Sequence, residues 1–181
     1  MANAFYFLIN LVFDLALFVV ILRWWLQTSR ADFYNPVSQF VVKATNPLII
    51  PLRRVIPAIG ALDTATLLVA LLVSAAKVVV IAMLFTGYSS VGVLVVKSIL
   101  NLFWQGLDLL FYVLLARAVL SWFSQGRSPV EYLLAQLTEP LLRPIRKVVP
   151  SIGIIDLSTM VLVIAVIFVR IMVESYYLNL L

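Results

Sequence analysis

Five charged side chains lie within long apolar stretches of this sequence, where charge is costly. They are Asp14, Lys77, Asp108, Arg170 and Glu174. Charges in apolar surroundings either pair with an opposite charge or line a hydrated path for an ion or a proton. Asp14 and Lys77 lie at similar distances from the ends of their stretches, and Asp108 and Arg170 occupy the corresponding places later in the chain. We therefore predict the ion pairs Asp14–Lys77 and Asp108–Arg170. A hydrated path is the alternative, to which Glu174 adds a third charge.

A stripe of polar side chains runs along one of these stretches, spaced by three and four residues. It consists of Ser98, Asn101, Gln105, Asp108 and Tyr112. This spacing places the side chains on one face of a helix. Polar side chains of this kind join membrane helices by hydrogen bonds. Three interpretations stay open: contacts between helices of one bundle, a face for a second copy of the chain, or a polar cavity or partner site.

Two residue types that carry much of enzyme chemistry are missing, because the sequence has no cysteine and no histidine. Their absence excludes disulfides, thiolate nucleophiles, Cys/His zinc sites, histidine-ligated haem and histidine acid–base catalysis. The sequence also lacks a glycine-rich phosphate loop. Ion pairing or helix capping accounts for the carboxylates. We expect no catalytic residue, no metal ligand and no cofactor, and we expect that the protein is not an enzyme.

The elements that position these residues occur twice. Residues 36–66 align with residues 129–159, and 13 of these 31 positions are identical. An internal duplication predicts two structural units. We place them at residues 1–88 and 89–181.

The composition indicates whether these units fold in water or in a lipid bilayer. Hydrophobic residues make up 64% and charged residues 12% of the chain, whereas soluble domains have roughly 45–50% and about 25%. Four apolar stretches are long enough to cross a bilayer, at about 5–26, 62–85, 98–123 and 155–178. The fold class is therefore an α-helical membrane protein, because lipid offers no partner to unpaired backbone groups. We expect four transmembrane helices, arranged as two tandem repeats of helix, amphipathic loop and helix.

The distribution of basic residues predicts the orientation in the membrane. The net charge is +5, but eight of the 13 lysines and arginines lie in the two long loops. This bias places both loops in the cytoplasm and both termini outside. It does not indicate nucleic acid as a partner. Both repeats then enter the membrane the same way up, as parallel repeats do.

Each long loop, at residues 36–57 and 129–150, has an amphipathic pattern. In the first loop, Pro36 is suited to the first position of a helix, and Val37, Phe40, Val41 and Ala44 share one face. We expect this helix to break at Asn46-Pro47, and its counterpart at Glu139-Pro140. The basic residues near the ends of the loops are Arg53, Arg54, Arg143, Arg146 and Lys147. We predict that they contact lipid phosphates or a partner from a helix at the membrane surface. Alternatively, the loops pack on the bundle and their charges serve topology alone.

Two aspartates directly precede the second apolar stretch of each repeat. Asp63 and Asp156 can accept hydrogen bonds from the free N–H groups of the first helical turn. Arg23 and Arg117 end the preceding stretch at the same membrane edge. The sequence therefore predicts two helix caps and the interfacial ion pairs Arg23–Asp63 and Arg117–Asp156.

The sequence resembles the YggT family of small bacterial membrane proteins, known as YlmG in other lineages. The resemblance rests on Arg117-x-x-Leu120-Ser121-Trp122, on Ser128-Pro129, on the block from Glu139 to Pro150, and on Gly153-x-x-Asp156. A first copy of the block runs from Asn46 to Pro57. The chain looks like the tandem, two-copy form. It departs from the family pattern after Arg23, where Trp24-Trp25-Leu26 is not followed by Ser-Trp.

The resemblance implies a location in the bacterial inner membrane and a link to osmotic-stress tolerance and ion homeostasis. It assigns no catalytic role to the shared residues. Two functions stay open. One is a scaffold or assembly factor that binds membrane lipids and another membrane protein or a second copy. The other is ion permeation, or modulation of ion flux, through the charges of the second repeat.

Overall fold

The computed structural model describes residues 2–56, 63–87, 90–124, 128–149 and 157–178. These residues are almost entirely helical, and none of them forms a strand. The helices are α1 (Ala2–Thr28), α2 (Pro36–Arg53), α3 (Thr64–Ile81), the π-helix η1 (Ala82–Thr86), α4 (Val91–Ser124), α5 (Pro129–Arg146) and α6 (Leu157–Leu178).

Four helical stretches are long and apolar enough to cross a membrane. They are Asn3–Thr28, Thr64–Thr86, Val91–Ser121 and Leu157–Tyr177, with mean hydropathies of 2.5, 2.7, 1.6 and 2.3. The predicted all-helical fold is therefore confirmed, and the four stretches agree with the predicted multi-pass membrane protein. The third predicted stretch began at residue 98, directly after the charged Lys97. Helix α4 begins earlier, at Val91, and contains Lys97.

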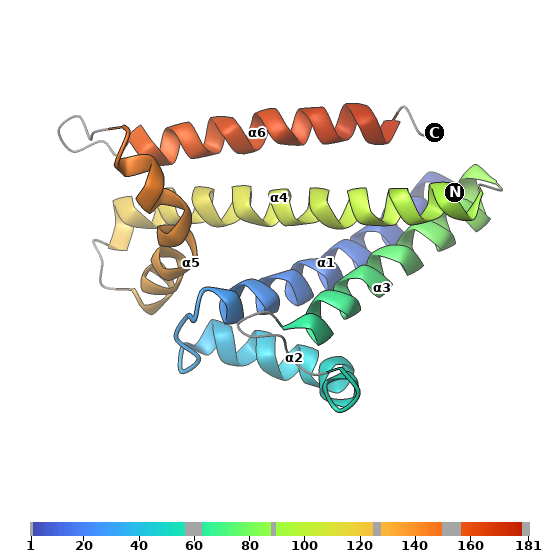
Figure 1. Cartoon of the computed structure of the whole chain (residues 1–181), viewed down its shortest axis with the longest axis horizontal. Helices are drawn as coiled ribbons and strands as arrows, with labels where there is room; N and C mark the ends of the chain where they lie inside the picture. The colour runs from blue at the N-terminus through green and yellow to red at the C-terminus, as the bar shows by residue number, and fades with distance from the viewer. Residues whose placement is uncertain (1, 57–62, 88–89, 125–127, 150–156, 179–181) are drawn as a thin grey trace.

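Helix α4 is the central element of the bundle. Figure 1 shows α6 on one side of α4 and the pair α1 and α3 on the other. The start of α1 lies at one end of the bundle, and α2 and α5 lie across the other end. The main hydrophobic core is at the α2 and α5 end, where Leu17, Val69 and Leu109 meet Val41 of α2 and Leu133 of α5.

Neither amphipathic helix breaks at its first internal proline, so that expectation was wrong. Helix α2 continues through Pro47 and Pro51, and α5 continues through Pro140 and Pro144. A proline removes one backbone hydrogen bond and clashes with the carbonyl group four residues earlier, so it bends a helix. Figure 1 shows that both helices change direction along their length. The buried residues of α2 extend to both sides of Pro47, so packing on the bundle holds the helix together across the bend.

The predicted apolar face of α2 is divided between the bundle and the surface. The buried residues are Ser38, Val41, Thr45 and Ile49, whereas Phe40 and Ala44 are exposed. Thr45 lies on the packed face because the bundle presents the buried Arg23 to it. The helix thus packs on the bundle with one face and exposes apolar side chains such as Phe40 on another.

Candidate functional site

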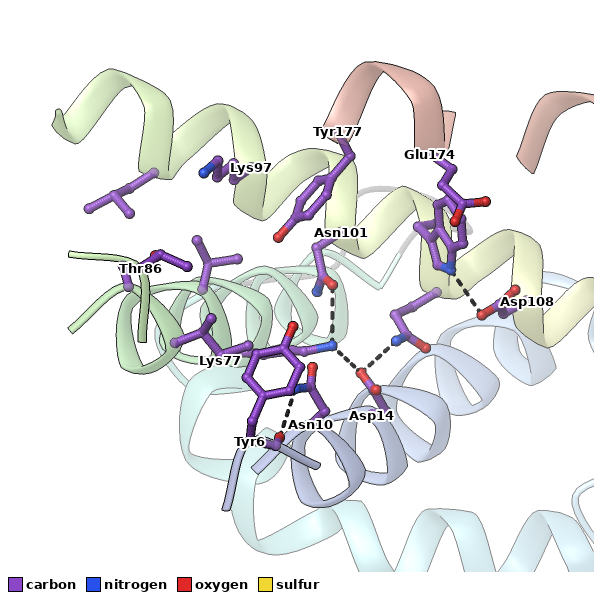
Figure 2. A pocket seen from close by; sticks show the side chains of 16 residues that line it. Tyr6, Asn10, Asp14, Lys77, Thr86, Lys97, Asn101, Asp108, Glu174 and Tyr177 are labelled. Atoms are coloured by element: carbon purple, nitrogen blue, oxygen red, sulfur yellow. Dashed lines mark hydrogen bonds and ion pairs between the residues drawn. The ribbon is translucent and has the colours of Figure 1, made fainter. Parts of the chain in front are cut away.

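A network of polar side chains links α1, α3 and α4 within the bundle, and we call it the Asp14 network. The Lys77 Nζ donates a hydrogen bond to the Asp14 Oδ1 at 2.5 Å, and the Gln105 Nε2 donates to the same oxygen at 2.5 Å. Lys77 is also 3.5 Å from the Asn101 Oδ1 (Figure 2). The side chain of Lys77 is 8% exposed and that of Asp14 is 36% exposed. The predicted ion pair therefore forms. It matters more for the charge of Lys77, which is buried, than for the charge of Asp14, which is partly exposed.

Two residues of the polar stripe on α4 also bind Ser74 of α3, a residue that the sequence analysis missed. The Ser74 Oγ donates to the Ser98 carbonyl oxygen at 2.7 Å and accepts from the Asn101 Nδ2 at 2.8 Å. Ser74 lies three residues before Lys77, on the same face of α3, and that spacing is the signal that could have revealed it. Tyr112 is exposed and lies outside the network. Four of the five stripe residues therefore face other helices of the same chain or the polar cavity beside them.

The second predicted ion pair forms between α4 and α6. An Arg170 Nη2 lies 2.6 Å from the Asp108 Oδ1, and the Trp104 Nε1 donates to the Asp108 Oδ2 at 3.0 Å. The Arg170 guanidinium lies over the rings of Trp104 and Phe111, at 5.8 and 5.2 Å from their centroids. Arginine binds carboxylates and aromatic faces at the same time because its guanidinium is planar. The charge of Arg170 is thus matched by one acid and two aromatic rings.

A polar cavity of about 450 Å³ lies beside both ion pairs, between α1, α3, α4 and α6. Asp14, Lys77 and Asp108 reach it, and so does Glu174, which is exposed and forms no ion pair in the described part of the chain (Figure 2). The lining also contains Lys97, which the sequence analysis passed over. Four of the five intramembrane charges therefore line one cavity.

At the other end of the bundle, Arg23 holds α2 against α1. Its Nη1 donates to the Thr45 Oγ1 at 2.7 Å, to the Asn46 Oδ1 at 2.8 Å and to the Val42 carbonyl oxygen at 2.9 Å. The predicted pair Arg23–Asp63 is not formed, because α2 continues past its prolines and brings Arg53 to Asp63 at 2.5 Å. Arg23 therefore binds α2, the helix that contains the prolines, and not Asp63, the cap of α3.

Arg117 has a similar place in the second half. Its Nη1 donates to the Thr138 Oγ1, and its Nη2 lies 3.7 Å from a Glu139 carboxylate oxygen. Thr138 and Glu139 correspond to Thr45 and Asn46 at the repeat offset. Asp156, the predicted partner of Arg117, lies outside the described residues.

The predicted cap at Asp63 is confirmed. The Thr66 backbone N–H donates to the Asp63 Oδ1 at 3.3 Å, and Asp63 precedes the first residue of α3. Burial by itself raises the pKa of the Asp63 carboxyl, but hydrogen bonds from Arg53 and Thr66 outweigh burial and hold the pKa below its usual value. Asp63 therefore stays ionised at neutral pH at the start of a membrane-crossing helix, where the helix dipole favours negative charge.

The five basic residues predicted to contact lipid phosphates or a partner fall into two groups. Arg53 pairs with Asp63, and Arg146 pairs with Glu139 at 2.7 Å. Arg54, Arg143 and Lys147 are exposed and form no ion pair within the described ranges. This second group is the one available to a lipid head group or a partner.

The comparison with protein families matches this chain twice. The family described as CCB3/YggT matches residues 2–84 and again residues 96–177. The chain belongs to the CCB3/YggT family. Each matched stretch contains one of the two contacts between an arginine and a threonine, Arg23 with Thr45 and Arg117 with Thr138.

Several curated members of the CCB3/YggT family are similar to this chain over most of its length. An uncharacterized protein from the proC 3′ region of Vibrio alginolyticus is 51% identical over 168 residues, which cover 92% of this chain and 91% of that protein. The uncharacterized protein YggT of Escherichia coli K12 is 49% identical over 164 residues, covering 89% and 84% of the two chains. An uncharacterized protein of Haemophilus influenzae is 40% identical over 173 residues, covering 96% and 91%. No solved structure matches the chain.

Among the described residues, no group of three or more aspartates and glutamates is placed to hold a metal ion. The two carboxylates deepest in the bundle each lie against a basic side chain, Asp14 against Lys77 and Asp108 against Arg170. The chemistry that this arrangement favours is the joining of helices and the binding of charged or polar groups.

Proposed function

We propose that this family member is a non-enzymatic scaffold or assembly factor of the bacterial inner membrane, which supports osmotic-stress tolerance and ion homeostasis. The link to osmotic stress and ions rests on the resemblance to the family. The molecular role rests on the use of the intramembrane charges. Two of the three intramembrane acids, Asp14 and Asp108, are each neutralised by a base on another helix, as is typical of charges that fix a bundle.

The surface that a partner would meet is formed by α2 and α5. These helices and their C-caps expose the basic residues Arg54, Arg143 and Lys147, and the helices also expose apolar side chains such as Phe40 and Tyr132. A helix with basic and apolar exposed faces suits the boundary between lipid head groups and acyl chains. We propose that membrane lipids and a second membrane protein, or a second copy of this chain, bind here.

This proposal includes an orientation in which α2 and α5 are cytoplasmic, both termini are periplasmic and the two repeats are parallel. The bias of basic residues toward the two loops supports it. The chain has no cysteine, so one introduced at Arg54 would be the only reactive thiol. Labelling of that cysteine by an impermeant reagent in intact cells would contradict the orientation.

The second candidate function is ion permeation, and the polar cavity favours it. The cavity brings Asp14, Asp108 and Glu174 to one hollow, and acidic residues that face a cavity mark ion paths in other membrane proteins. Against this stands the ion pair of Asp108 with Arg170, which removes the negative charge that would attract a cation.

Complementation of a deletion strain under osmotic stress separates the two functions. We expect the double substitution Arg143→Glu with Lys147→Glu to restore growth no better than an empty vector, because it reverses the charge of the exposed face of α5. The matched substitution Asp108→Asn with Arg170→Gln removes an ion pair as a unit, and we expect it to restore growth fully. Both proteins must accumulate in the membrane like the native one. The opposite pattern would support permeation and contradict the scaffold.

A further inference from the structure

Lys97 has a largely buried side chain and no protein partner among the described residues. It lies on α4 and is 6% exposed, and it forms no ion pair or hydrogen bond within the described part of the chain. Lys77, the other lysine that lines the polar cavity, is equally buried but has Asp14 and Asn101 as partners. The Lys97 Nζ is not among the buried polar atoms that lack a partner, so the amino group is accessible at the cavity that Lys97 lines.

The polar cavity beside Lys97 is large enough to hold a ligand. Its volume of about 450 Å³ corresponds to roughly 15 water molecules at about 30 Å³ each. Figure 2 shows Lys97 at one end of this cavity, near Thr86 and Tyr177. Lys97 is six residues from the start of α4, which is about 9 Å along a helix axis. The cavity therefore reaches Lys97 close to the depth of lipid head groups.

The charges around this end of the cavity leave a positive excess. Lys77 and Lys97 supply two positive charges, whereas Asp14 supplies one negative charge and is already bound to Lys77. Asp108 is eleven residues further along α4, about 16 Å away along the axis, and it is bound to Arg170. Glu174 lies nearer Asp108 than Lys97 in Figure 2. This end of the cavity therefore has a net positive charge, which favours the binding of an anion.

Neutral hydrogen-bonding groups surround the same space. Tyr6, Asn10 and Tyr177 line the cavity, and Tyr177 points into it from α6 (Figure 2). Hydroxyl and amide groups donate hydrogen bonds to oxyanions, and lysine binds phosphate as a point charge. We propose that the polar cavity binds a phosphate group at Lys97, supplied either by a lipid head group or by free inorganic phosphate. This site is separate from the exposed basic faces of α2 and α5 and does not depend on the proposed scaffold function.

The test measures thermal unfolding of the purified full chain in a neutral detergent, with phosphate or chloride at equal ionic strength. Native protein should show a rise in Tm that saturates with phosphate, because a ligand that binds only the folded state stabilises it. Lys97→Met should weaken phosphate binding about tenfold or more, since it removes a charge-assisted contact. Lys97→Arg keeps the charge and should retain most of the shift.

Two controls make the outcome specific. Arg54→Gln with Lys147→Gln removes exposed basic residues and should leave the phosphate-dependent rise in Tm unchanged. Without phosphate, Lys97→Met should be at least as stable as the native protein, because the Lys97 amino group has no protein partner to lose in the described part of the chain. A lower Tm for Lys97→Met in chloride would show that Lys97 has a structural partner and would overturn the proposal.

Addition of a phospholipid distinguishes the two possible sources of the phosphate, a lipid head group and the free anion. Phosphatidylglycerol added to the micelles should raise the Tm of the native protein and not of Lys97→Met if a head group fills the site. A rise with inorganic phosphate but not with this lipid would assign the site to a free anion. No rise with either ligand, or an equal rise in Lys97→Met, would overturn the proposal.

Discussion

Substitution of Arg23 by methionine is expected to lower the free energy of unfolding by roughly 3–5 kcal/mol. Arg23 is 3% exposed, and its Nη1 donates to three acceptors of α2, which are the Val42 carbonyl, Thr45 and Asn46. Methionine fills much of the same volume but donates no hydrogen bond. The loss should appear as a shift in unfolding by sodium dodecyl sulfate in mixed micelles.

The reason for so large an effect is the proline in α2. Pro47 removes a backbone hydrogen bond and bends the helix, and Arg23 binds the residues directly before the bend. Arg54→Met is the matched control, because Arg54 is exposed and forms no ion pair within the described ranges. It should change stability by less than about 0.5 kcal/mol. Equal effects of the two substitutions would contradict the role given to Arg23.

The second large effect is expected at the ion pair of Asp14 with Lys77. Asp14→Asn should cost about 2–3 kcal/mol, somewhat less than the full cost of breaking a buried pair, because Asp14 is partly exposed. Lys77→Gln should cost less than Asp14→Asn. The reason is that Asp14→Asn takes from the buried lysine its only charged partner among the described residues, whereas in Lys77→Gln the aspartate keeps Gln105 and access to solvent.

The double substitution of Asp14→Asn with Lys77→Gln isolates the interaction. It should be more stable than Asp14→Asn alone, because it removes the buried charge together with its partner. The measurement is the same unfolding in mixed micelles. A double variant that is as damaged as the sum of the single variants would mean that the two side chains do not stabilise each other.

The two halves of the chain use equivalent acids differently. Asp14 accepts from Lys77 of the first half and from Gln105 of the second, so it joins the halves. Asp108 binds Arg170 and Trp104 and stays within the second half. The polar stripe on α4 causes this difference, because the corresponding positions of α1 carry Phe7 and Leu11 in place of Asn101 and Gln105. The halves are therefore interlocked, and neither ion-pair region is a copy of the other.

The sequence predicted the pairs of intramembrane charges because so few partners are available to a charge in an apolar stretch. Depth alone was enough to match Asp14 with Lys77 and Asp108 with Arg170. The cap at Asp63 was predictable for a similar reason, since capping depends on local sequence. The membrane class and the helical fold followed from composition and length.

What could not be predicted depends on the course of the chain through its prolines. Local rules end a helix at Asn46-Pro47, but tertiary packing carries α2 on to Arg53 and thus changes the partner of Asp63 from Arg23 to Arg53. Lys97 was passed over because it lies at the edge of an apolar stretch, where lysines normally reach water. Only the packing of α4 shows that this lysine is buried beside a cavity.

The measurement that tests the central claim most directly is ion flux through reconstituted proteoliposomes. Potassium, sodium and proton flux should be compared for the native protein, for Asp108→Asn and for empty vesicles. Because Asp14 and Asp108 are each bound to a base, a scaffold should give no flux above empty vesicles while the protein remains folded. A flux through the native protein that Asp108→Asn abolishes would contradict the scaffold and assign the cavity to an ion path.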